Sequence, residues 1–189
     1  MKQKFVLVLC TVFIIVLAAC GGSKFPLNGV WTASMYGEEI SLLLIDDLSY
    51  FMYDDEIEKT DSFTFEKDSG TIRFWGERMN FTVKGNVMTA TMDGETLIFN
   101  KDTKTKAAPN SVGGAWYGPS RWVLAIINNM IIIIDEDNDL DYGTFTVNGN
   151  SGSFECDGWL KGTFEVKSGK LTLNETGYFK KSIEFTRTR

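Results

Sequence analysis

The sequence predicts an all-β protein with two tandem, small, antiparallel up-and-down β-barrels of about eight short strands each, after an N-terminal signal segment. Three observations lead to this prediction. Apolar residues recur at every second position, short turns rich in Gly, Asn and Asp separate the apolar segments, and the second half of the chain repeats the first. After the first nineteen residues, no stretch carries apolar residues at helical spacing.

The N-terminal segment, 1–19, has the composition of a signal peptide. Lys2 and Lys4 precede an apolar run of 15 residues, Phe5 to Ala19. A permanent membrane-spanning helix needs roughly 20. The run ends in the sequence LAAC, which resembles the lipobox of bacterial lipoprotein precursors. The resemblance implies cleavage before Cys20, lipidation of its thiol and anchoring by acyl chains such as palmitate. The alternative is an ordinary signal peptide in which Cys20 is incidental.

The residues after the cleavage position extend these expectations. Residues 20–26 would form the lipidated tether. Gly21 stands where many lipoproteins of the inner membrane carry aspartate, so the resemblance implies export with a lipid anchor at the outer membrane or cell surface. Cys10 leaves with the signal peptide, and Cys156 is then the only free thiol of the mature chain. Cys156 is expected to be a buried small hydrophobe.

The tandem repeat appears when the second half is aligned with the first. Trp31 in LNGVW matches Trp116 in VGGAW with an offset of 85 residues. Segment 63–74 matches 145–156 with an offset of 82, and FTVK at 81 matches FEVK at 164 with an offset of 83. LIFNK at 97 matches IEFTR at 183 with an offset of 86. Ordered offsets of this kind indicate a duplicated module.

The repeat also sets the domain boundaries. It predicts one barrel in 27–101 and a second in 113–189. The stretch between them, 102–112, is polar, contains Pro109 and lacks apolar periodicity, so it is predicted to be a linker.

Strands of the first barrel are predicted where alternate residues are apolar. These residues are Trp31, Ala33 and Met35; Ile40, Leu42 and Leu44; Phe63 and Phe65; Ile72 and Phe74; Met79, Phe81 and Val83; and Leu97 and Phe99. The intervening KDSG, KGN and MDGE are typical of hairpin turns. The second half repeats the scheme.

A Gly-x-Trp motif that opens an antiparallel eight-stranded meander resembles the lipocalins and the wider calycin superfamily. Each half is similar to the short lipocalin-like domains of bacterial surface lipoproteins. The resemblance implies that Trp31 and Trp116 close one barrel end, each under a basic residue, and Lys101 and Arg187 lie at the matching places. Lipocalin strands are longer than those expected here, so a filled interior is favoured over one that holds a small ligand.

The residue inventory argues against catalysis. The chain has no histidine, which excludes Ser-His-Asp and Cys-His catalysis and any histidine-bound metal. It also lacks a phosphate-binding glycine loop, a G-x-S-x-G elbow and a CxxC motif. We therefore expect no enzymatic activity and no cofactor. The acidic balance, 25 Asp and Glu against 19 Lys and Arg, excludes binding to nucleic acid by charge.

An acidic turn in the second half alternates Asp135, Asp137, Asp139 and Asp141. The spacing is similar to a calcium loop, but Leu140 replaces the turn glycine and Thr146 replaces the bidentate glutamate. We interpret the turn as a solvated hairpin tip. The alternative is a weak cation or partner site formed by the four aspartates.

Three tryptophans have no tryptophan at the matching position of the other half: Trp75, Trp122 and Trp159. Such residues are candidates for a recognition surface, although core packing explains most tryptophans. The preferred function is noncatalytic binding of a protein or glycan partner by an anchored envelope lipoprotein. Two alternatives remain, a carrier of a small apolar ligand inside a barrel and a structural envelope component.

Overall fold

The computed structural model describes residues 26–54, 56–156, 160–177 and 180–187. The predicted signal peptide, Cys20 with nearly all of the tether, and Trp159 lie outside the described residues. Within the described ranges, no helix has the length and apolar composition that a membrane span requires.

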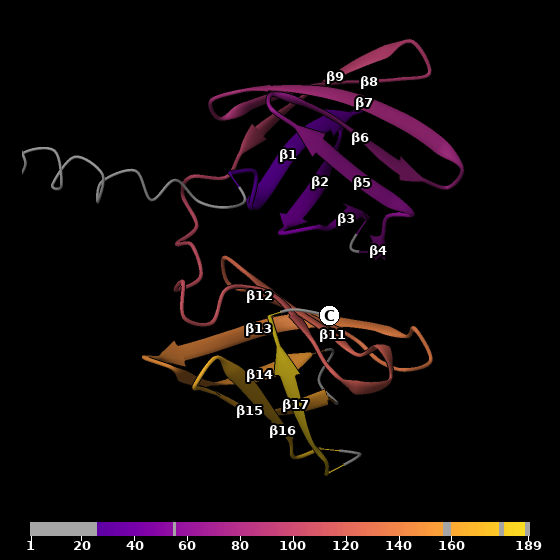
Figure 1. Cartoon of the computed structure of the whole chain (residues 1–189). Helices are drawn as coiled ribbons and strands as arrows, with labels where there is room; N and C mark the ends of the chain where they lie inside the picture. Colours follow the sequence, from indigo (N-terminus) through magenta and orange to yellow (C-terminus); the bar gives the residue numbers. More distant parts are fainter. Residues whose placement is uncertain (1–25, 55, 157–159, 178–179, 188–189) are drawn as a thin grey trace, which may run out of the picture.

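The first module is a single curled antiparallel sheet of nine strands, drawn in indigo to pink in Figure 1. The order across the sheet is β4-β3-β2-β1-β9-β8-β7-β6-β5. Its strands are β1 (Gly29–Met35), β2 (Glu38–Ile45), β3 (Leu48–Tyr53), β4 (Glu56–Lys59), β5 (Ser62–Glu66), β6 (Ser69–Phe74), β7 (Glu77–Lys84), β8 (Val87–Met92) and β9 (Glu95–Lys101).

The second module is a closed antiparallel barrel of eight strands in sequence order, drawn in orange to yellow. Its strands are β10 (Gly114–Tyr117), β11 (Val123–Ile127), β12 (Met130–Ile134), β13 (Leu140–Asn148), β14 (Ser151–Cys156), β15 (Leu160–Lys167), β16 (Lys170–Glu175) and β17 (Ser182–Thr186). A short 3₁₀ turn, η1 (Pro119–Arg121), follows β10. Residues 102–113 contain no strand.

The two modules share one strand plan, but only the second closes. Strand β13 pairs with β12 through 140–144 and with β14 through 143–148, so its two pairings overlap. In the first module the equivalent strand is broken into β4 and β5 at Thr60 and Asp61. Thr60 N donates to Ser49 O on one side, and Asp61 N donates to Arg73 O on the other. The prediction of a closed barrel is therefore confirmed for the second module and wrong for the first.

A glycine accounts for part of this difference. Gly143 of β13 is aligned with Asp61. A Cβ atom at Gly143 would lie 2.0 Å from the carbonyl oxygen of Glu155 and 2.6 Å from Cα of Cys156. Only glycine permits such an approach of two backbones. Asp61 carries a Cβ, so it cannot reproduce the contact that Gly143 makes with the backbone of Glu155 and Cys156.

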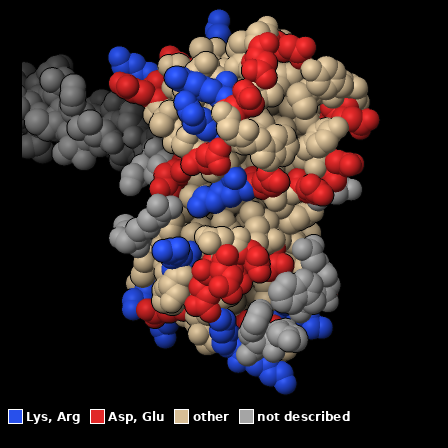
Figure 2. Space-filling model, turned by 90° about the vertical axis from the view of Figure 1, so that its right-hand side faces the viewer, with Lys and Arg blue, Asp and Glu red and all other residues tan. Residues whose placement is uncertain are grey.

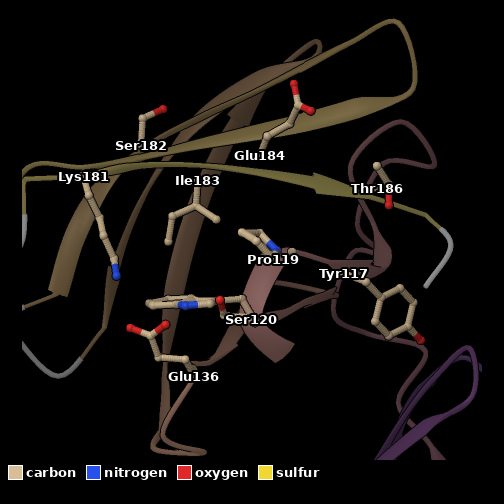
Figure 3. A pocket seen from close by; sticks show the side chains of 11 residues that line it. Tyr117, Pro119, Ser120, Glu136, Lys181, Ser182, Ile183, Glu184 and Thr186 are labelled. Atoms are coloured by element: carbon tan, nitrogen blue, oxygen red, sulfur yellow. The ribbon is translucent and has the colours of Figure 1, made fainter.

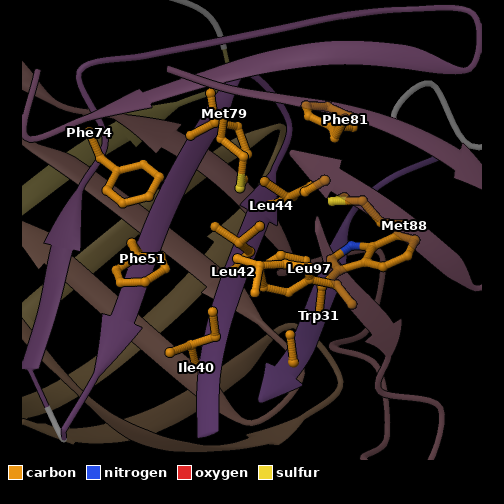
Figure 4. Packing of buried hydrophobic residues seen from close by; sticks show 14 of the residues in the cluster. Trp31, Ile40, Leu42, Leu44, Phe51, Phe74, Met79, Phe81, Met88 and Leu97 are labelled. Carbon is orange, nitrogen blue, oxygen red and sulfur yellow. The ribbon is translucent and has the colours of Figure 1, made fainter. Parts of the chain in front are cut away.

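Large apolar side chains fill the interior of the first module (Figure 4). Trp31, Ile40, Leu42, Leu44 and Phe99 are all at most 1% exposed. The second module has an equivalent core around Trp116, Leu124 and Phe164, and it includes the buried Cys156. The expected burial of that thiol is confirmed.

A third apolar cluster lies between the modules. It joins the outer faces of β2 to β4 with those of β10 to β12. Equivalent positions of the two repeats both belong to it, namely Leu43 and Ala125, Ile45 and Ile127, and Tyr50 and Ile132. The interface is thus built from the same patch on both modules, as in a twofold dimer.

This interface explains why some strands are apolar throughout. In β12, Ile131 and Ile133 point into the barrel, while Ile132 and Ile134 enter the cluster between the modules. A strand buried on both faces reads as a continuous apolar run instead of an alternating one. The MIIII segment is therefore covered on both sides, which removes the aggregation hazard of an exposed apolar strand.

The turn between β2 and β3 joins the starts of the two repeats. Asp46 Oδ1 accepts a hydrogen bond of 2.8 Å from Asn28 Nδ2, and Asp46 Oδ2 accepts one of 2.8 Å from the backbone N of Ala115. The neighbouring Asp47 accepts a hydrogen bond from the Tyr117 hydroxyl. The LNGVW and VGGAW segments are therefore linked through one carboxylate.

Candidate binding surfaces

Trp31 and Trp116 mark equivalent ends of the two modules, which we call the tryptophan ends. Each indole is 1% exposed. Trp31 Nε1 donates to Leu27 O at 2.9 Å, and Trp116 Nε1 donates to Val112 O at 2.8 Å. Both indoles are thus fixed within the fold and leave no aromatic surface for a ligand.

A cation lies over each of these indoles. Lys101 Nζ is 5.3 Å from the ring centroid of Trp31, and Arg187 Cζ is 3.7 Å from that of Trp116. Burial lowers the pKa of both cations, and the negative charge of Asp46 partly opposes the lowering at Arg187. The basic residue expected over each tryptophan is therefore present.

We call the opposite end of each module the turn end. In the second module a groove of about 630 Å³ opens there (Figure 3). Its apolar side includes Pro119, Trp122 and Ile183, and its charged side chains are Glu136 and Lys181. Glu184 also borders the groove, but its carboxylate points away from it (Figure 3) and pairs with Lys170 at 2.7 Å. The residues come from the end of β10 and the loop after it, the turn after β12, the loop before β17 and strand β17.

Trp122 forms the base of this groove and is 7% exposed. Lys181 Nζ lies 4.5 Å from its ring centroid. Figure 3 shows the Lys181 ammonium and the Glu136 carboxylate pointing toward one another. The groove therefore combines an apolar base with charges of both signs, a lining that suits a polar ligand with some apolar surface.

The loop over the groove has an unusual backbone. Ser120 (φ 50°) and Arg121 (φ 72°) are consecutive non-glycine residues in the left-handed region. Each such residue costs about 1–2 kcal/mol. At Gly118 a Cβ atom would lie 2.9 Å from Cβ of Trp122 and 3.0 Å from the Phe185 ring. The glycine lets the loop lie directly on the barrel and fixes the wall of the groove.

The turn end of the first module has a different character. Trp75, in the turn between β6 and β7, is 62% exposed. Its ring contacts Phe51 and Phe74 edge-on, with centroids 5.6 and 5.5 Å apart. Its Nε1 donates to a carboxylate oxygen of Glu58 on β4. The side chain is thus held in place while most of its surface stays open to solvent.

The structure separates the tryptophans proposed for a recognition surface. Trp75 is exposed on the first module, Trp122 is nearly buried in the second, and Trp159 lies outside the described residues. The strand bounds also correct the prediction that Trp75 and Trp159 have no counterpart in the other half. Residue 159 falls between β14 and β15, and Trp75 between β6 and β7, so both modules carry a tryptophan in the segment that links these equivalent strands. A one-residue difference in turn length hid this match.

The side chains of the acidic turn do not converge to form a metal site in the structure. Asp135 Oδ1 accepts hydrogen bonds from the backbone N of Asp137 at 2.9 Å and of Asp139 at 3.0 Å. Over the described part of the chain, no three acidic or cysteine side chains gather to hold a metal ion. The carboxylate of Asp135 therefore stabilises its own turn.

The sequence contained a signal for the groove. The repeat offset falls from 85 to 82 at the loop after β10 and rises from 83 to 86 at the loop before β17. Both loops line the groove. The sequence did not single out Glu136 and Lys181, because one charged residue in a loop forms no recognisable motif. The two changes in repeat offset nevertheless fall at loops that line the groove.

Comparison of the chain with family models, curated proteins and solved structures finds no match.

Proposed function

We propose that the chain is a noncatalytic binding protein, anchored to the cell envelope by lipid on Cys20, and that the groove of the second module binds an envelope glycan. One observation carries the proposal. The described module interiors are packed with side chains, whereas the turn end of the second module keeps an open groove. Binding at the surface is therefore favoured over carriage of a ligand inside.

The lining of the groove supports a glycan partner. Sugars offer apolar ring faces for aromatic and aliphatic groups and hydroxyls for polar side chains. Trp122 and Ile183, each 7% exposed, form an apolar base, while Lys181 and Glu136 provide hydrogen-bonding groups beside it. The fixed loop at Ser120 reduces the entropy lost on binding.

The remaining parts of the proposal rest on the sequence. The LAAC segment and the basic, apolar start support export and lipidation, with placement at the outer membrane or cell surface. The Gly-x-Trp openings, together with the tryptophan and cation at each tryptophan end, support a lipocalin-like origin of both modules.

The groove is tested by binding of the full chain to immobilised polysaccharide and peptidoglycan fragments from a bacterial envelope. The variant Lys181→Met with Glu136→Gln removes both groove charges and keeps side-chain size. The matched control, Lys84→Met with Glu66→Gln, makes the same changes at two exposed positions of the first module, away from the groove. We expect at least tenfold weaker binding for the groove variant and no change for the control. Equal binding by both variants would refute the groove.

Two further measurements separate the alternatives. Native mass spectrometry of the chain purified from its host should show no stoichiometric small molecule, and a retained apolar ligand would establish a carrier instead. Cys20→Ser should release the protein from the membrane fraction. A variant that stays bound would contradict the lipid anchor.

A further inference from the structure

We propose that the turn end of the first module is a second interaction surface, and that it binds arginine-bearing segments of a partner protein. Residues of the turns after β1, β3, β6 and β8 form this surface, which is separate from the groove of the second module.

Two exposed aromatic side chains project from these turns. Tyr36 is 84% exposed and Trp75 is 62% exposed. Each occupies the first position of an Xaa-Gly turn in the left-handed region, with φ of 55° and 52°. Asn, Asp or Gly are preferred there, and the turn at Asp93-Gly94 follows that preference. A large aromatic residue is unfavourable in the left-handed conformation that Tyr36 and Trp75 adopt. The need to form a turn therefore does not explain why aromatic residues occupy these positions.

Each of these aromatics is paired with a carboxylate from a neighbouring hairpin. Trp75 Nε1 donates to Glu58, and the Tyr36 hydroxyl donates to Glu95 Oε2 at 3.3 Å. Trp75 is further fixed by its contacts with Phe51 and Phe74. The surface thus presents the same chemical unit twice, an ordered aromatic face beside a carboxylate.

This unit matches a guanidinium group. Arginine stacks on aromatic faces and at the same time donates to a carboxylate through its planar fork of N–H groups. An ammonium can satisfy the charge but cannot stack in the same way. The arrangement therefore selects arginine over lysine among basic partners.

The surrounding charge favours the same partner. The described residues of the four turns, with two strand residues on either side, include seven acidic and two basic side chains, all exposed. The acidic ones are Glu38, Glu39, Asp54, Glu56, Glu77, Asp93 and Glu95, and the basic ones are Arg73 and Arg78. Arg78 already donates to Asn80 Oδ1 at 3.0 Å. Figure 2 shows acidic groups on the right of the first, upper module, and basic groups on its left and centre. The acidic excess at the four turns attracts a basic segment and repels an acidic one.

The test is a titration of the full chain with three synthetic peptides that alternate glycine with arginine, lysine or glutamate. Binding is followed by calorimetry at physiological ionic strength and by the NMR signal of the Trp75 indole N–H, assigned with Trp75→Phe. We expect the arginine peptide to bind and shift this signal, the lysine peptide to bind at least threefold more weakly, and the glutamate peptide not to bind.

Variants then separate the proposed unit from general charge attraction. Glu58→Gln with Glu95→Gln removes the two paired carboxylates. Glu66→Gln with Asp68→Asn removes the same charge at the tryptophan end of the module. We expect at least tenfold weaker binding of the arginine peptide for the first pair and less than a threefold change for the second. Equal weakening by both pairs, or an unchanged affinity in Tyr36→Ala with Trp75→Ala, would overturn the proposal. Ile98→Thr, another exposed apolar position, serves as the control for these aromatic variants.

Discussion

The two modules are copies that differ at one strand. The fourth strand is continuous in the second module, whereas it is broken at Thr60 and Asp61 in the first. Phe51 and Phe74 stack in the first module with centroids 4.7 Å apart, at the places that Ile133 and Cys156 occupy in the second. Bulkier side chains inside the wall and the lack of a glycine at Asp61 both hold the first module open. Barrel closure is therefore decided by a few side-chain volumes and not by the strand plan.

The copies also differ at their turn ends, where the candidate binding surfaces lie. The first module has short turns with exposed aromatics, and the second has longer loops around a groove. The tryptophan ends, by contrast, are alike in both. The shared features stabilise the fold, and both proposed binding surfaces lie at the ends where the modules differ.

The largest expected effect concerns the interface between the modules. Ile132→Asp would place an unpaired charge in a fully buried cluster and should lower the free energy of unfolding by about 4 kcal/mol. Urea denaturation measures the effect. Ile98→Asp, at a position 57% exposed, should change it by less than about 0.5 kcal/mol. If the two variants were equally stable, the modules would not be packed as described.

A smaller effect tests the closure of the second barrel. Gly143→Ala forces a Cβ against the backbone of β14 and should cost about 3 kcal/mol. Gly149→Ala is the control, because its φ of 65° is also unfavourable for alanine but no atom lies within 4 Å of the added Cβ. It should cost about 1 kcal/mol. Hydrogen exchange should speed up at residues 143 and 144 only in the first variant, and unchanged exchange there would argue against the glycine explanation.

The smallest effect concerns the link between the two repeats. Asp46→Ala removes the acceptor for Asn28 and for the backbone N–H of Ala115, and it should cost about 2 kcal/mol more than Asp93→Ala. Both aspartates have a positive φ, so the backbone cost of alanine is similar in the two variants. Thermal unfolding compares them. No difference between them would show that the carboxylate contributes nothing to the junction.

The sequence by itself predicted the duplication, the place of the two tryptophans with their cations, and strands β1, β2, β5, β6, β7 and β9 of the first module. It did not single out β3, β4 and β8 as strands. The predicted features depend on local alternation and on turn chemistry, which neighbouring residues specify. The amino acids at Asp61 and Gly143 were visible too, but their meaning depends on how close two strands come, and no pattern of apolar residues records that distance.

Only the tertiary structure decided which apolar faces meet between the modules, and which loops form the groove. Leu43 and Ile132 look like ordinary strand residues until the two outer faces are brought together. In the same way, Trp75 and Trp122 are both unmatched tryptophans in the sequence, yet one is exposed and the other nearly buried. Burial depends on contacts between residues far apart in the chain, and periodicity within one strand cannot specify them.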